Sequence, residues 1–321
     1  MTTSTDQLQC RLRIVLAGGS GQIGSFLAAH FQRHGHHVTV LTRAPFTANW
    51  PTVYWDGENE DTRESGWVET LNGADVLIHL SGRSIACPFT PQNRQQIYNS
   101  RLRSTRLLGR VIASLPAPPR LWLNASAALI DALPSRLLFA CHPWGARVFL
   151  ARLAADWEGE FFAASTPHTR KIALRSALFL APASGNLFNL LSMLARAGVG
   201  GTMGNGHQFV SWIHADDYAR AIDFLIARND LEGPFNLAAP EPLPNRAFMA
   251  ALRDAWDRPN GLPLPALLLR LVSLVRADAG LSLHSCHVLP NHLLAAGFTF
   301  EFPDWPSAAQ DLARQWRQRN K

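Results

Sequence analysis

An apolar run that opens into a glycine-rich turn constrains the fold of this chain more than any other feature. Residues 12–24 read LRIVLAGGSGQIG, which satisfies G-x-G-x-x-G from Gly19 and G-x-x-G-x-x-G from Gly18. Glycines permit a tight turn and bring backbone N–H groups close to a diphosphate at the positive end of the following helix. Glycine turns also join strands to helices for packing alone, but this context favours a dinucleotide site, whose predicted contacts are Gly18, Gly19, Ser20, Gly21, Gln22, Ile23 and Gly24.

Strand and helix signals alternate through the first 182 residues. Six β-rich runs separated by helical segments predict an α/β fold with a doubly wound parallel sheet. A long helix at 91–115 carries apolar residues on one face. The predicted strands cover 13–18, 37–43, 52–57, 74–82, 119–127 and 170–181, and the other predicted helices cover 22–34, 65–71 and 149–164.

After Pro182 the alternation loosens into segments bounded by glycine and proline. A strand-like FVSWIH at 209–214 and a helix from Asp216 to Ala227 stand out there. We therefore expect a nucleotide-binding domain at 1–182 and a smaller, interleaved C-terminal substrate lobe at 183–321, with 209–230 packing back onto the first domain.

Composition and charge set broad limits on function. The chain has 321 residues, of which 47% are hydrophobic, which is enough for one large domain or two coupled ones. The formal charge of +6 and a pI near 9.7 suggest an anionic ligand. The arginines are scattered, so we expect no nucleic-acid partner. The basic end at 314–321 closes a predicted helix, whose negative terminus it complements.

The cysteines and the apolar segments indicate the compartment. Four cysteines lie far apart, without the spacing of a zinc site or a disulfide framework, so we expect no metal and a reducing, cytoplasmic location. No signal-peptide pattern and no membrane-spanning run is visible, so no membrane association is expected. The most apolar run, Pro263–Val275, contains Arg270 and predicts a buried helix.

The ends of two predicted strands indicate which nicotinamide cofactor is bound. An NAD site commonly places an acidic residue after the second strand, whereas this chain has Thr42-Arg43, a cation suited to a 2′-phosphate. NADP(H) is therefore the predicted cofactor, although Arg43 is also explained as a solvated strand-end residue. Leu80, Ser81 and Gly82 end the fourth strand and are expected near the adenosine ribose.

Several blocks of sequence resemble the extended short-chain dehydrogenase/reductase superfamily, whose fold is of the Rossmann type. They are GGSGQIG, ADVLIHLSG, IYNSRLRSTRLL (97–108), NASA (124–127) and DWE (156–158). Three further blocks are similar to the epimerase-family proteins of the YfcH or SulA-like type with their characteristic C-terminal segment: 204–222, 233–245 and 289–305. This resemblance covers nearly the whole chain and implies NADP(H) binding without an established substrate.

The resemblance implies a catalytic serine, but not the tyrosine and lysine that accompany it in the superfamily. Ser126 matches the serine that orients a substrate oxygen. Counting back from DWE, the tyrosine and lysine positions fall at Leu150 and Ala154, neither of which can move a proton. The chain also departs from its relatives at 129–131, where Asp131 is a candidate base or a turn residue.

Other candidates are weighed against simpler roles. His142 is a candidate acid in a loop. Arg101 is a candidate cofactor or substrate contact, or else part of a salt bridge. Gln208 is a candidate substrate contact or a turn residue, and Trp212 and His214 are candidate pocket residues, with a core role equally open for His214. Asp216 or Asp217 is expected to cap a helix.

Taken together, these features predict an NADP(H)-binding oxidoreductase or epimerase that acts on an unidentified small molecule, as a monomer or homodimer. The proton donor is unassigned, because the Tyr-Lys pair is missing. Two alternatives stay open: a non-catalytic NADP(H)-binding redox sensor, and a cell-division or assembly factor in which the nucleotide is structural.

Overall fold

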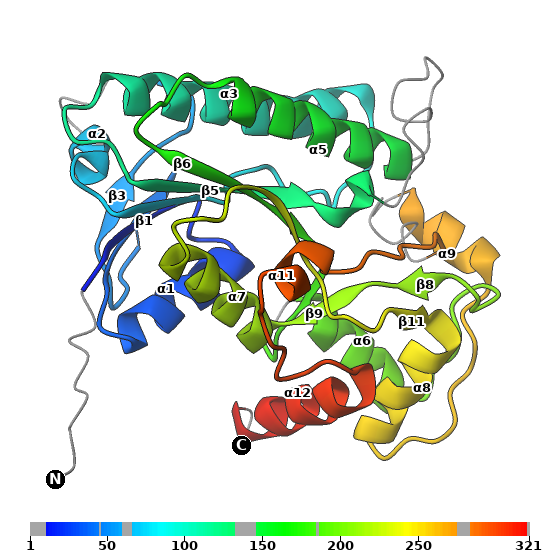
Figure 1. Ribbon diagram of the computed structural model, residues 1–321. Helices are drawn as coiled ribbons and strands as arrows, with labels where there is room; N and C mark the ends of the chain where they lie inside the picture. The colour runs from blue at the N-terminus through cyan, green and yellow to red at the C-terminus, as the bar shows by residue number, and fades with distance from the viewer. Residues whose placement is uncertain are drawn as a thin grey trace, which may run out of the picture.

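A parallel sheet of seven strands forms the centre of the molecule (Figure 1). The computed structural model describes residues 11–44, 46–59, 66–131, 146–183, 186–274 and 283–319. The strand order is β10-β6-β5-β4-β1-β2-β3, so the chain winds outward in both directions from β1 and β4. The strands are β1 (Arg13–Ala17), β2 (His37–Thr42), β3 (Thr52–Tyr54), β4 (Val76–His79), β5 (Leu121–Ala127), β6 (Arg170–Ser176) and β10 (Gly233–Leu237).

Helices cover both faces of this sheet, as the predicted doubly wound fold requires (Figure 1). On one face α3 packs on α5, and Leu108 and Ile112 of α3 share a core with Trp122 of β5. On the other face, Leu27 of α1 and Ile222 of α7 pack against the strands. Because both faces are covered, all four residues of β4 are buried. The helices are α1 (Gln22–Arg33), α2 (Trp67–Leu71), α3 (Pro91–Ser114), α5 (Ala146–Ala163) and α7 (Ala215–Ala227).

The sequence predicted six strands, and the structure corrects the last of them. The run 170–181 ends in the main sheet at Ser176 and continues as a short strand, β7 (Leu178–Leu180), which pairs with β9 (Trp212–His214). The chain leaves the sheet there because the Leu178 N–H donates to the carbonyl of Ser211. The seventh strand, β10, comes from the FNLAA region and pairs with β6.

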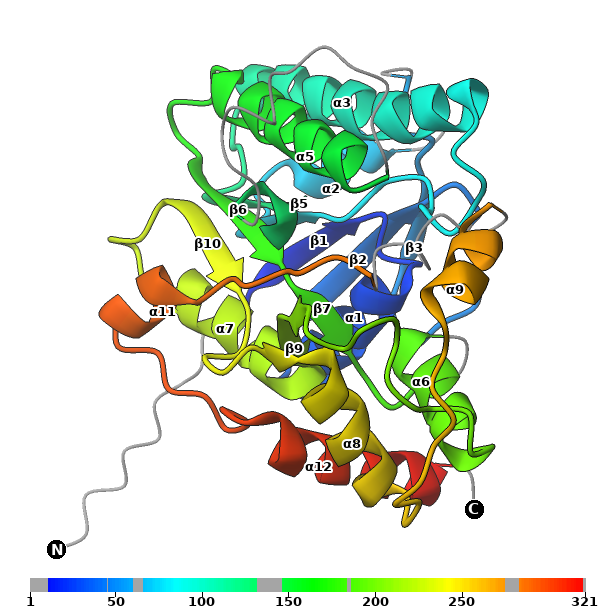
Figure 2. The ribbon, with the colours of Figure 1, turned by 90° about the vertical axis from the view of Figure 1, so that its right-hand side faces the viewer.

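A second core lies beside the sheet and is built mainly from later segments (Figure 2). Phe248 stacks on Trp305 with ring centroids 4.1 Å apart, and Trp212 packs edge-on against Trp305. The elements around this core are α6 (Leu187–Arg196), β8 (Phe209–Val210), β11 (Leu243–Pro244), α8 (Asn245–Ala255), α9 (Ala266–Ser273) and α12 (Trp305–Arg319), whereas α11 (Asn291–Ala295) packs on β10 and buries Leu293 in the core of the sheet.

The apolar run 263–275 does not form the predicted buried helix. It forms α9, in which Leu269 is buried but Leu267 and Leu271 are 69% and 55% exposed. A helix of eight residues at the surface has one inward side only, so most of its leucines face outward. In the part of the chain that the structure describes, no helix has the length and apolarity that crossing a bilayer requires.

Candidate functional site

The glycine turn between β1 and α1 is shaped by close backbone contacts. Gly18 has φ +80°, and a Cβ there would lie 2.6 Å from Cα of Ser81 at the end of β4. A Cβ on Gly24 would lie 2.4 Å from Cα of Gly19. The first turn of α1 can therefore lie this close to the glycine turn only because residues 19 and 24 are both glycine. Gly21 is the N-cap of α1, and no side chain caps the helix. No side chain therefore occupies the cap position at the positive end of α1, an arrangement suited to a phosphate group.

The end of β2 lies next to this turn. The Thr42 hydroxyl donates to Oγ of Ser20 over 3.1 Å, which joins the strand end to the turn. Arg43 follows it with an exposed side chain, and it forms no ion pair with any described residue. A cation is therefore present beside the turn, where the sequence predicted the 2′-phosphate contact.

At the end of β4, Gly82 packs against Arg101 of α3. A Cβ on Gly82 would lie 2.7 Å from Cζ of Arg101. The Arg101 Nη1 group donates to the carbonyls of Arg83 and Ile97, both at 3.1 Å, and its guanidinium lies 5.4 Å from the ring centre of Trp157. Among the described carboxylates, none forms the salt bridge considered for Arg101.

A buried histidine lies below this strand end and was not singled out from the sequence. His79, the last residue of β4, hydrogen-bonds Asn124 Oδ1 through Nδ1 at 2.7 Å and Ser104 Oγ through Nε2 at 3.1 Å. Burial lowers the pKa of His79 to about 4. Its imidazole is therefore neutral at physiological pH and links β4, β5 and α3.

The predicted serine belongs to a buried charged network. Ser126 lies at the end of β5, directly across from Arg175 of β6 in the sheet register. Its hydroxyl donates to Oε1 of Glu158 on α5 over 2.5 Å. Arg175 donates to both oxygens of Glu158, at 2.9 and 2.8 Å, and to Asp131 Oδ1 at 2.8 Å. The hydrogen bonds to Glu158, above all, raise the pKa of Arg175, so the guanidinium stays charged in this network.

Asp131 and the empty Tyr-Lys positions can now be placed. Asp131 is not a free base, because Arg175 and the Asn236 amide, 2.9 Å away, both donate to it. Leu150 and Ala154 are buried on α5, at 6% and 2% exposure, so neither supplies a proton. His142 lies outside the described residues.

Sequence reasoning missed the roles of Glu158 and Arg175. The only signal was the DWE block, which was used for the resemblance and not as a source of a buried carboxylate. Arg175 gave no signal, because its contact with Glu158 joins a strand to a helix 17 residues earlier in the chain.

The structure buries the three residues that the sequence predicted to line a substrate pocket. Gln208 is buried and donates to the carbonyl of Met203 at 2.8 Å. Trp212 is fully buried in the second core. His214 is also buried, stacks on Phe302 with ring centroids 3.9 Å apart, and accepts the Asp216 N–H as the N-cap of α7. The cap predicted for an aspartate is therefore made by this histidine, one residue before the helix begins.

His214 also belongs to a group with the composition of a metal site. Its ring nitrogen and carboxylate oxygens of Asp216 and Asp311 lie within 4.8 Å of one another. However, Gln315 donates to both carboxylates, at 3.2 and 2.7 Å, and Arg314 pairs with Asp311. These partners already satisfy the carboxylates and attach α12 to the start of α7.

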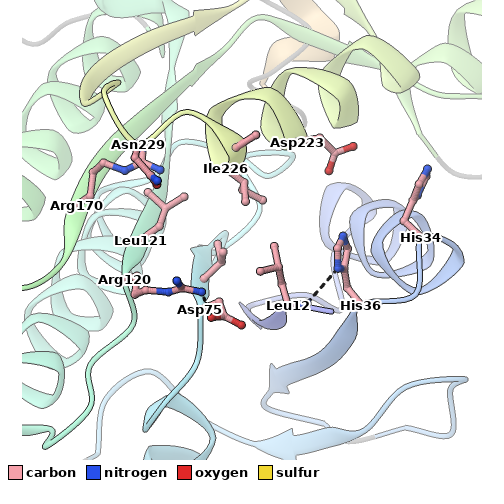
Figure 3. A pocket seen from close by; sticks show the side chains of 12 residues that line it. Leu12, His34, His36, Asp75, Arg120, Leu121, Arg170, Asp223, Ile226 and Asn229 are labelled. Carbon is pink, nitrogen blue, oxygen red and sulfur yellow. Dashed lines mark hydrogen bonds and ion pairs between the residues drawn. The ribbon is translucent and has the colours of Figure 1, made fainter. Parts of the chain in front are cut away.

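A cavity of about 540 Å³ lies at the opposite edge of the sheet (Figure 3). It is lined by residues at the starts of strands, among them Asp75 and Arg120, and by Asp223 and Ile226 of α7. Arg120 pairs with Asp75 and Asp223 with His30, and Arg170 donates to the backbone carbonyls of Leu225 and Leu231. Ligands of parallel α/β sheets bind beyond the carboxyl ends of the strands, so the edge with the glycine turn is the better candidate.

Comparisons with known proteins match nearly the whole chain. The model of the NAD dependent epimerase/dehydratase family matches residues 14–238, and a domain of unknown function, DUF1731, matches residues 264–312. The epimerase family protein SERP0438 of Staphylococcus epidermidis is 31% identical over 308 residues, which cover 94% of this chain and 99% of that protein. The epimerase family protein SDR39U1 of Homo sapiens is 30% identical over 307 residues, with coverage of 94% and 99%.

A solved structure agrees with this match. The crystal structure of human SDR39U1 (isoform 2) with NADPH has a TM-score of 0.80 to this chain at 27% sequence identity. The similarity covers 94% of this chain and 99% of that one. The sheet and the smaller C-terminal region thus share one architecture with that protein.

Proposed function

This chain belongs to the NAD dependent epimerase/dehydratase family, and from that membership we propose that it is an NADP(H)-dependent oxidoreductase or epimerase acting on a small molecule. The observation that carries the proposal is the close packing of Gly18 against Ser81 beside a helix, α1, whose N-cap Gly21 supplies no side-chain cap. Backbone N–H groups at a helix start bind phosphate groups. The likeness to human SDR39U1, whose crystal structure contains NADPH, supports the choice of cofactor.

Arg43 is the residue we assign to the 2′-phosphate. It follows β2, is exposed, and has no ion-pair partner among the described residues. A guanidinium binds a phosphate through paired, charge-assisted hydrogen bonds. The nicotinamide of the bound cofactor supplies hydride exchange with a substrate carbon.

Ser126 orients the substrate through its oxygen lone pairs. Its hydroxyl donates to Glu158, which also accepts hydrogen bonds from Arg175. Its Oγ therefore accepts a hydrogen bond from a ligand more readily than it donates one. This polarity favours a substrate hydroxyl over a carbonyl as the group bound at Ser126.

Cofactor titrations test the binding part of the proposal. Wild type should bind NADPH more tightly than NADH, and Arg43→Ala should weaken NADPH binding roughly 10- to 100-fold, the value of a charge-assisted contact. NADH binding should change little in the same variant. The control variant is Arg33→Ala, which also removes one positive charge, but at the far end of α1. Equal wild-type affinities for NADPH and NADH would contradict the assignment.

Turnover assays test the catalytic part. We expect NADP⁺ reduction with at least one alcohol from a panel of secondary alcohols and nucleotide sugars, and loss of that activity in Ser126→Ala with NADPH binding intact. A second candidate, a non-catalytic NADP(H) sensor, is favoured by the buried Leu150 and Ala154 at the Tyr-Lys positions. Binding without turnover in either direction across the panel would favour the sensor.

A further inference from the structure

Exposed apolar side chains gather on α9 and on the residues beside it. Between residues 262 and 274, six large apolar side chains are at least 41% exposed. Single exposed leucines are common on protein surfaces, but a group of this size in a short stretch is typical of an interaction surface. We call this group the α9 face, and its members are Leu262, Leu267, Leu268, Leu271, Val272 and Leu274.

The helix that carries this face is attached to the second core at the edge of the molecule (Figure 2). Just before the helix, the Leu264 N–H donates to the Thr202 carbonyl and the Gly204 N–H donates to the Leu264 carbonyl, both at 2.9 Å. Leu269 is buried in the second core. At 3.6 residues per turn, the exposed positions from 267 to 274 span about 160° of arc, and Leu269 lies outside it. The helix therefore has one anchored side and one broad apolar side.

The stretch that contains the α9 face carries only positive charge. Arg258 and Arg270 are the only charged residues between 258 and 274. Arg270 is exposed, and its helical position lies about 40° from the edge of the apolar arc. If two copies of the chain docked α9 against α9, this stretch would offer no acidic residue to pair with either arginine. The charge pattern thus favours a partner that is both apolar and negatively charged.

We propose that the α9 face docks the protein on an anionic phospholipid bilayer. The leucines enter the boundary between headgroups and acyl chains, and Arg270 lies among the negative headgroups. A bilayer accepts a convex apolar side without the shape complementarity that a protein partner needs. Such docking is peripheral and reversible, and it needs no helix that crosses the membrane. It departs from the expectation of no membrane association, which considered only signal and spanning segments, and it does not depend on the proposed cofactor.

Co-sedimentation with lipid vesicles tests this inference. Wild type should bind vesicles of equal parts phosphatidylcholine and phosphatidylglycerol, and should bind phosphatidylcholine alone more weakly. The double variant Leu267→Ser/Leu271→Ser should lose at least about tenfold in affinity for the mixed vesicles, because it removes two apolar side chains from the bilayer contact. Arg270→Gln should lose roughly fivefold at low salt.

Two further variants protect the test against misfolding and against nonspecific effects. Leu274→Ser changes a residue at the C-cap that is 70% exposed, so it should weaken vesicle binding about threefold without disturbing the helix. The control is Leu294→Ser on α11, which removes a leucine that is 46% exposed and lies outside the α9 face. It should bind the mixed vesicles as wild type does. Thermal unfolding shows which variants retain the fold.

Four outcomes would overturn the inference. Wild type does not bind the mixed vesicles, or the folded leucine variants bind them as tightly as wild type, which would indicate adsorption through the net charge of the chain alone. Leu294→Ser loses as much affinity as Leu274→Ser. Sedimentation velocity shows a dimer that the double variant abolishes while vesicle binding persists, which would mean that a second copy covers the α9 face.

Discussion

The two halves of the candidate site are built on different physical principles. In the cofactor half, the segment after β4 approaches the glycine turn so closely that no Cβ fits on Gly18, and the nearby cations Arg43 and Arg101 have no described carboxylate partner. In the reaction half, Ser126 and Glu158 are hydrogen-bonded, and Arg175 neutralises the carboxylate. The first half is therefore completed by a ligand, and the second by its own residues.

This difference predicts how the two halves respond to mutation. A buried ion pair is destabilising to break, because the remaining charge stays buried without a partner. A steric contact between backbones changes stability less but changes the shape of the site. Substitutions in the reaction half should therefore lower stability most, and substitutions in the turn should lower cofactor binding most.

Glu158→Gln should have the largest effect on stability. It leaves the Arg175 guanidinium, 18% exposed, with Asp131 as its remaining carboxylate. Loss of one partner of a buried pair costs about 3–5 kcal/mol, and we expect the low end because Asp131 remains. Urea unfolding measures this loss. Glu160→Gln is the matched control, because its pair with the half-exposed Arg106 lies near the surface and contributes at most about 1 kcal/mol. Equal losses in the two variants would remove the contrast between the halves.

The next largest effect should come from His79, which should make the free energy of unfolding depend on pH. Its pKa is about 4 in the fold and near 6.5 in an unfolded chain. Between these values the unfolded state binds more protons, so stability falls as the pH falls. The loss attributable to His79 reaches about 3 kcal/mol at about 1.4 kcal/mol per pKa unit.

Unfolding free energies measured at steps between pH 7 and pH 4 test this prediction. The wild-type slope should be reduced in His79→Gln and kept in His207→Gln, whose side chain is exposed. A slope unchanged by His79→Gln would mean that the polar residues below β4 do not hold a neutral imidazole.

The fold could be predicted where the sequence signal is local. The first five strands and the helices between them follow from apolar runs and glycine turns, and α3 ends within one residue of its predicted end. The sixth run was divided wrongly, because the switch from β6 to β7 depends on pairing with β9, about 35 residues away in sequence. The exposure of α9 likewise depends on what packs beside it, so its composition alone was misleading.

The candidate site also contains residues that the local sequence predicted and residues whose contacts depend on the folded structure. The bare turn at Gly18 was predictable, because the glycines themselves mark the close approach. The partner of Ser126 was not predictable, since Glu158 reaches it only after α5 has folded across β5 and β6. His214 illustrates a third case: its cap on α7 replaces the usual aspartate, and no sequence rule favours histidine there.

Measured against a matched glycine, the contact at Gly18 should have the smallest of these effects on stability and a large one on binding. Gly18 and Gly35 have nearly the same positive φ, +80° and +81°, but only Gly18 has atoms near its missing Cβ; Gly35 has none within 4 Å. Alanine therefore brings the same backbone strain at both sites, and the excess loss at Gly18, about 1–3 kcal/mol, reports the contact with Ser81. Because that methyl group separates the turn from β4, NADPH titration should show lost binding in Gly18→Ala and wild-type binding in Gly35→Ala. If both variants bind NADPH normally, the close approach is only structural, and the cofactor half does not depend on it.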